Sequence, residues 1–157
     1  MEQHFALRFP SPIRYEMEKE VTIILIEDNP DHAELIRRCI NLTKRNISLQ
    51  VISNGEEAIL YFEKYRTFDF ELQDKPVLIF LDLRLPKVDG MEILKMLKSD
   101  TKLSTLPVIV LTSSNNENDF NKVSHYNAES YLLKPIDCMK IITIVQQFYP
   151  DNHIERV

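Results

Sequence analysis

Five short apolar segments, each followed by a stretch with helical spacing, constrain the fold of this 157-residue chain more than any other feature. The apolar segments cover residues 21–26, 47–53, 76–81, 107–111 and 129–133, and helical spacing recurs within residues 33–42, 58–62, 90–98, 115–127 and 136–149. Short runs that are apolar throughout are typical of strands buried on both faces. Their alternation with helices predicts an α/β fold, a doubly wound five-stranded parallel sheet with helices on both faces.

The chain length suits one domain, which we place at residues 21–150. Residues 1–20 are expected to form an N-terminal extension and residues 151–157 a short C-terminal tail. Residues 65–75 make a long connection for a compact α/β domain. The apolar side chains expected to hold that connection against the body are Phe68, Phe70 and Leu72.

Charge and composition exclude several function classes. The net charge is −5 and no basic block is present, so neither nucleic acid nor an anionic membrane is expected as the main partner. No apolar stretch approaches the roughly 18 residues of a transmembrane helix, and the N-terminus lacks the apolar core of a signal peptide, which favours a cytoplasmic protein. Gly55 and Gly90 are the only glycines, whereas glycine-rich phosphate loops need several close together. A phosphate would therefore be bound by side chains and a metal ion.

The cysteines and histidines show no spacing that indicates a metal or redox site. Cys39 and Cys138 lie far apart in the sequence and are expected to be reduced thiols of a cytoplasmic protein. His32 stands at the start of a predicted helix and is expected to be solvated.

Polar side chains collect at the carboxyl ends of the predicted strands, where open α/β sheets bind their ligands. The residues at these ends are Glu27, Asp28, Asp82, Thr112 and Lys134. Each has an ordinary alternative, because an acid can cap a helix or form a turn, a hydroxyl can be satisfied at a strand end, and a lysine can be solvated. Since four strand ends agree, we favour a single shared site.

The chemistry of such a site is specific. Three carboxylates cannot all stay ionised a few ångströms apart without cations. Lys134 supplies one positive charge, and oxygen ligands favour a hard divalent ion such as Mg²⁺, with Mn²⁺ as an alternative. Asp82 would then be a nucleophile for phosphoryl transfer, because carboxylates form acyl phosphates. Lys134 and the Thr112 hydroxyl would stabilise the transferred group.

Four motifs carry a resemblance to a known family. IILIEDNP, IFLDLRLPKVDG, VIVLTSS and YLLKP occur in this order, and together they resemble a chemotaxis-regulator-like, single-domain receiver of two-component signalling over residues 20–149. The resemblance implies the strand order 2-1-3-4-5 and a phosphoryl group that Asp82 accepts from a histidine kinase. It also implies a signalling protein and not a classical enzyme, although one that assists its own phosphorylation and slowly hydrolyses its aspartyl phosphate.

The resemblance also implies a ligand set for the metal. Glu27 and Asp28 would form the acidic pair, and Asp28 and Asp82 would bind Mg²⁺ together with the backbone carbonyl of Arg84. Two residues depart from the commonest pattern, because the first acid is Glu27 and not aspartate, and because Arg84 brings a bulky cation close to the acceptor. Arg84 would either stabilise the phosphoryl group or shield it from water, and these two alternatives leave the lifetime of the phosphorylated state open.

The resemblance further implies a conformational switch. Thr112 and Lys134 would contact the phosphoryl group, and Thr112 and Tyr131 would form the switch. The bond between Lys134 and Pro135 is expected to be cis. An ordinary half-buried aromatic is the alternative for Tyr131.

Partners follow from the same features. The long connection before the third strand and the stand-alone architecture resemble regulators paired with phytochrome-type histidine kinases. Apolar residues of the last helix spread over an arc of roughly 220° at about 100° per residue, wider than packing on a sheet requires. We therefore expect a homodimer through the last helix and the fifth strand, with the N-terminal extension as an alternative cover.

Other functions fit less well. An aspartyl-phosphate phosphatase would place a second acid two residues after the nucleophile, where this chain has Arg84. An FMN-binding module would need a hydroxyl-rich phosphate loop where Glu27 and Asp28 would repel a phosphate. A phosphorelay intermediate and a non-phosphorylated receiver scaffold remain as alternatives within the resemblance.

Overall fold

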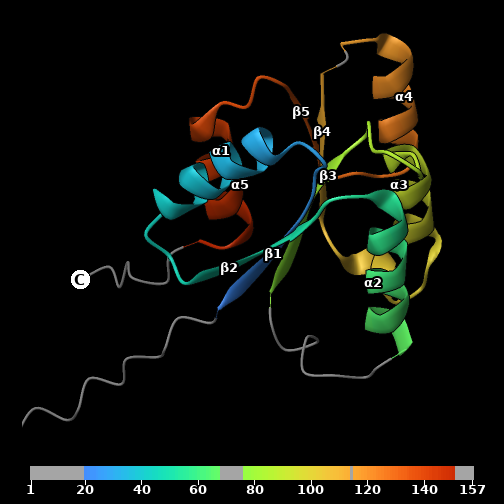
Figure 1. Cartoon of the computed structure of the whole chain (residues 1–157), viewed down its shortest axis with the longest axis horizontal. Coiled ribbons are helices and arrows are strands. Elements are labelled where there is room, and N and C mark those ends of the chain that lie inside the picture. The colour runs from blue at the N-terminus through green and yellow to red at the C-terminus, as the bar shows by residue number, and fades with distance from the viewer. Residues whose placement is uncertain (1–19, 68–75, 114, 151–157) are drawn as a thin grey trace, which may run out of the picture.

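The computed structural model describes residues 20–67, 76–113 and 115–150, and within them five parallel strands form one sheet in the order β2-β1-β3-β4-β5 (Figure 1). The strands are β1 (Val21–Ile26), β2 (Ile47–Ile52), β3 (Val77–Asp82), β4 (Val108–Thr112) and β5 (Ser130–Leu133). This confirms the predicted doubly wound sheet and its strand order. β2 and β5 are the edge strands of this sheet.

Helices cover both faces of the sheet, as the alternation of segments predicts (Figure 1). The helical elements of the described residues are α1 (Pro30–Asn41), α2 (Gly55–Thr67), α3 (Gly90–Ser99), the short 3₁₀ turn η2 (Leu103–Thr105), α4 (Glu117–His125) and α5 (Cys138–Phe148). α1 and α5 pack beside each other on one face, whereas α2, α3 and α4 contribute to the core on the other.

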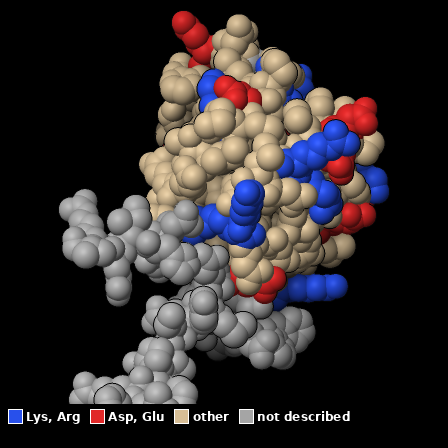
Figure 2. Space-filling model, turned by 90° about the vertical axis from the view of Figure 1, so that its left-hand side faces the viewer, with Lys and Arg blue, Asp and Glu red and all other residues tan. Residues whose placement is uncertain are grey.

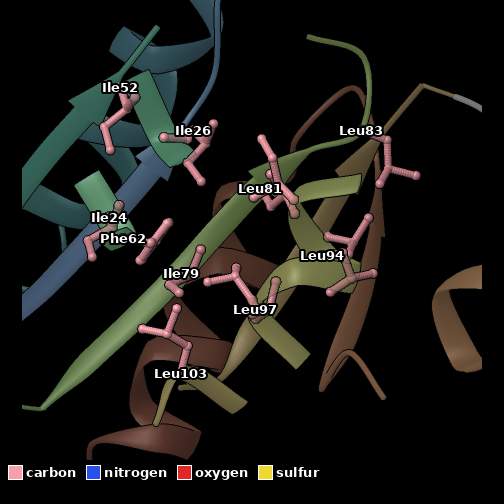
Figure 3. Packing of buried hydrophobic residues seen from close by; sticks show 14 of the residues in the cluster. Ile24, Ile26, Ile52, Phe62, Ile79, Leu81, Leu83, Leu94, Leu97 and Leu103 are labelled. Carbon is pink, nitrogen blue, oxygen red and sulfur yellow. The ribbon is translucent and has the colours of Figure 1, made fainter. Parts of the chain in front are cut away.

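The two cores follow from the alternation of side chains along each strand. Every residue of β1 and β3 is buried, because successive side chains of a strand point to opposite faces and both faces are covered. Ile24 and Ile79 point toward Phe62 of α2 (Figure 3), whereas Ile23 and Phe80 lie in the core beneath α1 and α5. The strands are therefore held rigidly, and so are the residues at their ends.

Helix boundaries are set by capping side chains that the apolar spacing does not report. The predicted helix over residues 115–127 begins at Glu117, because the side chain of Asn116 accepts a hydrogen bond from Asn118 N and caps it there. The predicted helix over 136–149 begins at Cys138, because Asp137 Oδ1 accepts a hydrogen bond from Met139 N at 2.9 Å. Such caps decide where a helix starts more sharply than a period does.

The expectation of reduced cysteines was wrong. Cys39 of α1 and Cys138 of α5 form a disulfide, with their Cα atoms 5.0 Å apart and a sequence separation of 99. α1 and α5 are distant in the sequence but adjacent in space, and Cys39 is fully buried between them. Sequence separation therefore gave no information on the distance between the two thiols.

Several expectations concern residues outside the described ranges. These are the extension before Glu20, the tail over 151–157, and the packing of Phe68, Phe70 and Leu72 against the body. Across the residues that are described, no helix combines the length and the apolar character needed to cross a membrane.

Candidate functional site

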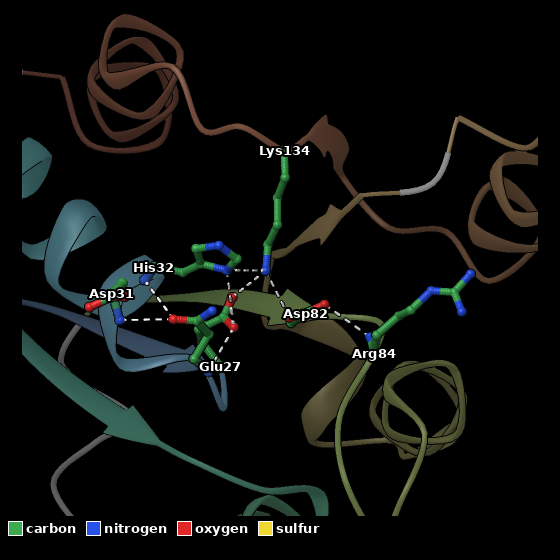
Figure 4. Close-up of polar contacts among 7 residues, drawn as sticks. Glu27, Asp31, His32, Asp82, Arg84 and Lys134 are labelled. Atoms are coloured by element: carbon green, nitrogen blue, oxygen red, sulfur yellow. Dashed lines mark hydrogen bonds and ion pairs between the residues drawn. The ribbon is translucent and has the colours of Figure 1, made fainter.

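Glu27, Asp82 and Lys134 of the predicted site meet at the carboxyl edge of the sheet (Figure 4). Glu27 follows β1 directly and is 1% exposed, Asp82 ends β3 at 5%, and Thr112 ends β4 at 0%. Lys134 follows β5 and reaches over the edge toward the two acids (Figure 4). Burial of this many polar groups requires that they be hydrogen-bonded or paired.

Lys134 joins the two buried acids. Its Nζ lies 2.6 Å from Glu27 Oε2 and 2.8 Å from Asp82 Oδ2, and its side chain is 10% exposed. The backbone N–H of Lys134 donates to the carbonyl of Thr112 at 2.7 Å, which fixes the chain where it leaves the sheet. The bond between Lys134 and Pro135 is cis, as expected. The alternative of a solvated lysine is therefore wrong.

Burial and hydrogen bonding act in opposite directions on the pKa values of Glu27 and Lys134. Burial raises the pKa of the Glu27 carboxyl, and the nearby Asp82 charge adds to this, although the Lys134 hydrogen bond opposes it. Burial alone would lower the pKa of the Lys134 ammonium, but the hydrogen bonds and charges of Asp82 and Glu27 outweigh it and raise that pKa. Lys134 is therefore held in its charged form beside the acids.

A third acid joins this pair at the carboxyl edge. Glu27, Asp28 and Asp82 each offer a carboxylate oxygen, and these three oxygens lie within 4.8 Å of one another. Asp28 is exposed, so the group is open to solvent on its side. Lys134 is bonded to two of these acids, so the group has three carboxylates and one ammonium. That imbalance makes the group suited to a divalent cation.

The loop after β3 holds the Asp82 carboxylate in place. The backbone N–H of Arg84 donates to Asp82 Oδ1 at 2.9 Å, whereas the Arg84 guanidinium points away from Asp82 into solvent (Figure 4). The loop returns closely to β3, because Gly90 N donates to the carbonyl of Leu83 at 3.0 Å. A Cβ atom at Gly90 would collide with the Asp82 carbonyl, so only glycine fits this close approach.

The two predicted switch residues lie on neighbouring strands. Thr112 pairs with Leu133 in the register of β4 and β5, and Tyr131 pairs with Val110 two residues earlier. The Tyr131 ring meets the Phe120 ring of α4 edge to face, with centroids 5.6 Å apart. Tyr131 therefore links the edge strand to α4.

The start of α1 brings in a residue that the sequence interpretation missed. His32 was expected to be solvated, but its Nδ1 lies 2.9 Å from Lys134 Nζ and 3.6 Å from Glu27 Oε1. Asn29 caps α1 by accepting from the backbone N–H groups of Asp31 and His32. Figure 4 shows the His32 ring beside the Lys134 ammonium. The signal was its position, because the first turn after β1 lies at the same edge as Glu27.

Comparison with known proteins bears on this arrangement. Residues 23–146 match the family model described as the response regulator receiver domain. The chain is 32% identical over 137 residues to the probable methanogenesis regulatory protein FilR2 of Methanothrix harundinacea, which covers 85% of this chain and 86% of FilR2. It is 31% identical over 124 residues to the response regulator Rcp1 of Synechocystis, which covers 79% of this chain and 83% of Rcp1.

Solved structures of response regulators also match this chain. The phosphorylated cyanobacterial phytochrome response regulator RcpA matches with a TM-score of 0.68 and 31% identity, covering 82% of this chain and 90% of RcpA. The Mn²⁺-bound form of Rcp1 matches with a TM-score of 0.66 and 29% identity, covering 81% of this chain and 90% of Rcp1. The predicted resemblance to phytochrome-associated regulators is confirmed by these matches.

Proposed function

Because the chain belongs to the response regulator receiver family of two-component signalling, we propose that Asp82 accepts a phosphoryl group from a histidine kinase. The observation that carries the proposal is the buried Asp82 carboxylate, bonded to Lys134 and grouped with Glu27 and Asp28. The receiver domain in this proposal spans residues 21–150. The chain is a signalling protein of that family and not a classical enzyme.

A divalent ion completes the proposed site. The three acids exceed Lys134 by two negative charges, which one Mg²⁺ or Mn²⁺ would balance. Asp28 and Asp82 would bind the ion directly with the backbone carbonyl of Arg84, and Glu27 would complete the acidic group. When bound, the ion supplies positive charge next to the transferred phosphoryl oxygens. The Mn²⁺-bound form of Rcp1 supports a metal in this family.

The transfer itself uses this chain's own side chains. An Asp82 oxygen attacks phosphorus, a P–O bond forms, the P–N bond to the kinase histidine breaks, and that nitrogen keeps the electron pair. Lys134 and the Thr112 hydroxyl donate hydrogen bonds to the phosphoryl oxygens. We propose that water later attacks the same phosphorus slowly, which returns Asp82 to its carboxylate.

The signal would leave through β5 and α4. The phosphoryl group draws in the Thr112 hydroxyl, and Tyr131 repacks in the space that this opens. The edge-to-face contact between Tyr131 and Phe120 supports this route, because a move of Tyr131 must change the packing of α4. Phosphorylation therefore alters the surface that α4 and β5 present to other proteins.

A phytochrome-type histidine kinase is the proposed partner, on the strength of the similarity to RcpA. The exchange would take place in the cytoplasm, where histidine kinases draw on ATP. Figure 2 shows Lys and Arg side chains lying among Asp and Glu on one side of the molecule, and not as a basic field. This mixed surface suits a protein partner better than nucleic acid or an anionic membrane. A phosphorelay step to a further histidine is the alternative within the same chemistry.

We also propose a homodimer through β5 and α5. Much of the wide apolar face of α5 packs against the sheet and α1, but Met139 remains 65% exposed, with Leu133 at 44% and Phe120 at 52%. These side chains lie on α5, on the edge strand β5 and on α4. Sedimentation velocity should show a dimer when beryllofluoride is added. A monomer at high micromolar concentration, with and without beryllofluoride, contradicts this proposal.

Phosphoryl incorporation tests the proposed acceptor. The protein is incubated with Mg²⁺ and acetyl phosphate, and its intact mass is followed with time. The wild type should gain one phosphoryl group, and Asp82→Asn or an excess of EDTA should prevent the gain. Glu63→Gln, which neutralises an exposed glutamate of α2, should behave as the wild type does. Equal incorporation in the wild type and Asp82→Asn refutes the proposal.

A further inference from the structure

We infer that His32 is a positioning residue for phosphoryl transfer, which holds the Lys134 ammonium at the carboxyl edge through its ring nitrogen Nδ1. This inference rests on the proposed function, in which Lys134 contacts the phosphoryl group. His32 touches neither phosphorus nor Asp82 in this role and acts through Lys134.

The hydrogen-bond capacity of the ammonium carries the first step. A lysine ammonium has three N–H donors and no acceptor. Lys134 Nζ has three acceptors at hydrogen-bond distance, namely Glu27 Oε2 at 2.6 Å, Asp82 Oδ2 at 2.8 Å and His32 Nδ1 at 2.9 Å. His32 therefore supplies the third acceptor, and Lys134 leaves no donor unmatched at a side chain that is 10% exposed.

The tautomer follows from the direction of that bond. Because the ammonium can only donate, His32 Nδ1 must accept, and the ring proton lies on Nε2. A neutral acceptor differs from a fourth carboxylate, since it holds Lys134 without adding negative charge to the three acids already grouped there. The site thus gains a fixed lysine while its charge remains matched to one divalent ion.

The backbone places His32 in this role independently of Lys134. Asn29 Oδ1 accepts from His32 N at 3.3 Å, and it accepts from Asp31 N at 2.9 Å. The cap lies between the end of β1 and the start of α1, so the His32 ring belongs to the first helical turn after Glu27. The His32 side chain is 43% exposed, which leaves it accessible at the edge and not part of the core.

The consequence appears when the phosphoryl group arrives. Lys134 must then redirect one N–H to a phosphoryl oxygen, and it loses the bond to Asp82 Oδ2 in doing so. Glu27 and His32 keep the other two donors, so the ammonium stays in place during the transfer. Without His32, Lys134 holds one fixed partner and its position becomes less precise.

Three variants test this inference in the full-length chain with Mg²⁺ and acetyl phosphate. His32→Leu keeps a similar shape and removes the acceptor, and it should slow phosphorylation roughly tenfold, the size expected for one hydrogen bond to a charged group. His32→Asn places an oxygen near the position of Nδ1 and should recover most of the rate. His125→Leu makes the same change at an exposed histidine of α4 and should leave the rate unaltered.

The outcomes separate this inference from the proposed function. Mg²⁺ affinity and the free energy of unfolding should stay near wild type in His32→Leu, because only the position of Lys134 is lost. A rate in His32→Leu equal to that of the wild type overturns the role of His32, and so does a rate in His32→Asn as low as that of His32→Leu. A wild type that takes up no phosphoryl group overturns the proposed function instead.

Discussion

Two lysines with nearly buried side chains lie at opposite ends of the strands, Lys98 at the amino ends and Lys134 at the carboxyl ends. Their surroundings differ in charge. Lys98 of α3 is 8% exposed, and its Nζ lies 2.7 Å from Glu129 Oε1 and 3.0 Å from the carbonyl of Leu106. Glu129 also accepts from the backbone N–H of Val108, at the start of β4. There one positive charge meets one negative charge, and backbone groups take the remaining bonds.

Lys134, at the carboxyl edge, is bonded to a group with an excess of acid. It contacts Glu27 and Asp82, and Asp28 lies close to both acids. A balanced pair bonded to the backbone contributes to structure, because nothing in it calls for a ligand. An unbalanced group at the carboxyl ends of the strands is suited to a further cation, and we propose that it is the functional one. We therefore expect Lys98 to contribute to stability and Lys134 to contribute to phosphoryl transfer.

Replacing the two lysines in turn gives the largest expected contrast. Lys134→Met should slow phosphorylation by acetyl phosphate by roughly 10²- to 10³-fold, because the transferred group loses a charged hydrogen-bond donor. Lys98→Met, the matched control, should leave the rate of the folded protein unchanged. Intact mass followed with time measures both rates. Equal rates in the two variants would erase the distinction between the edges.

The disulfide between Cys39 and Cys138 should act on stability alone. Replacing both cysteines by serine should lower the free energy of unfolding by about 4.7 kcal/mol, because a link across 99 residues no longer restricts the unfolded chain. Urea unfolding measures the loss, and reduction of the wild type by dithiothreitol should reproduce it. A double variant as stable as the oxidised wild type would show that this link contributes nothing.

Lys98→Met should lower the free energy of unfolding, although it should not change the rate of phosphorylation. Loss of Lys98 removes the donor of Glu129 Oε1 and of the Leu106 carbonyl at the amino edge, and we expect about 2 kcal/mol less stability. Glu129→Gln keeps the hydrogen-bonding shape and should cost less. Urea unfolding of both variants checks the order, and the reverse order would contradict a structural role for this pair.

Tyr149 should give the smallest effect, with a distinct pH dependence. Its hydroxyl donates to the carbonyl of Val77 at 2.8 Å, and burial raises its pKa from 10.0 to about 12. The unfolded state loses this proton first, so stability should fall as pH rises from about 10 to about 12. Tyr149→Phe should lose about 1 kcal/mol at neutral pH and show a shallower fall in that window. An identical alkaline profile in both proteins would contradict this assignment.

The sequence predicted the parts of the site that each strand end carries. Asp82 ends an apolar run, and parallel strands bring their carboxyl ends together, so its meeting with Glu27 and Lys134 followed from the pattern. The contact of His32 with Lys134 did not follow, because it depends on how the first turn of α1 is aimed. Local spacing reports the face of a helix but not the direction of one ring.

The missed disulfide and the missed Lys98 pair have a related cause. Both join elements whose contact is decided by helix packing over long sequence distances, and neither produces a local pattern. The wide apolar face of α5 had a similar explanation, since α1 covers part of it. Contacts that a helix makes with elements distant in the sequence could not be predicted from a single sequence.

Stabilisation by Mg²⁺ tests most directly whether the carboxyl edge carries an uncompensated acidic site. Thermal unfolding is measured with rising Mg²⁺ for the wild type, for Asp28→Ala and for Glu63→Ala, which removes an exposed acid of α2. Mg²⁺ at a hundredfold excess over its Kd should stabilise the wild type and Glu63→Ala by about 2.7 kcal/mol, and stabilise Asp28→Ala much less. No stabilisation of the wild type, or equal stabilisation of Asp28→Ala, would contradict the account.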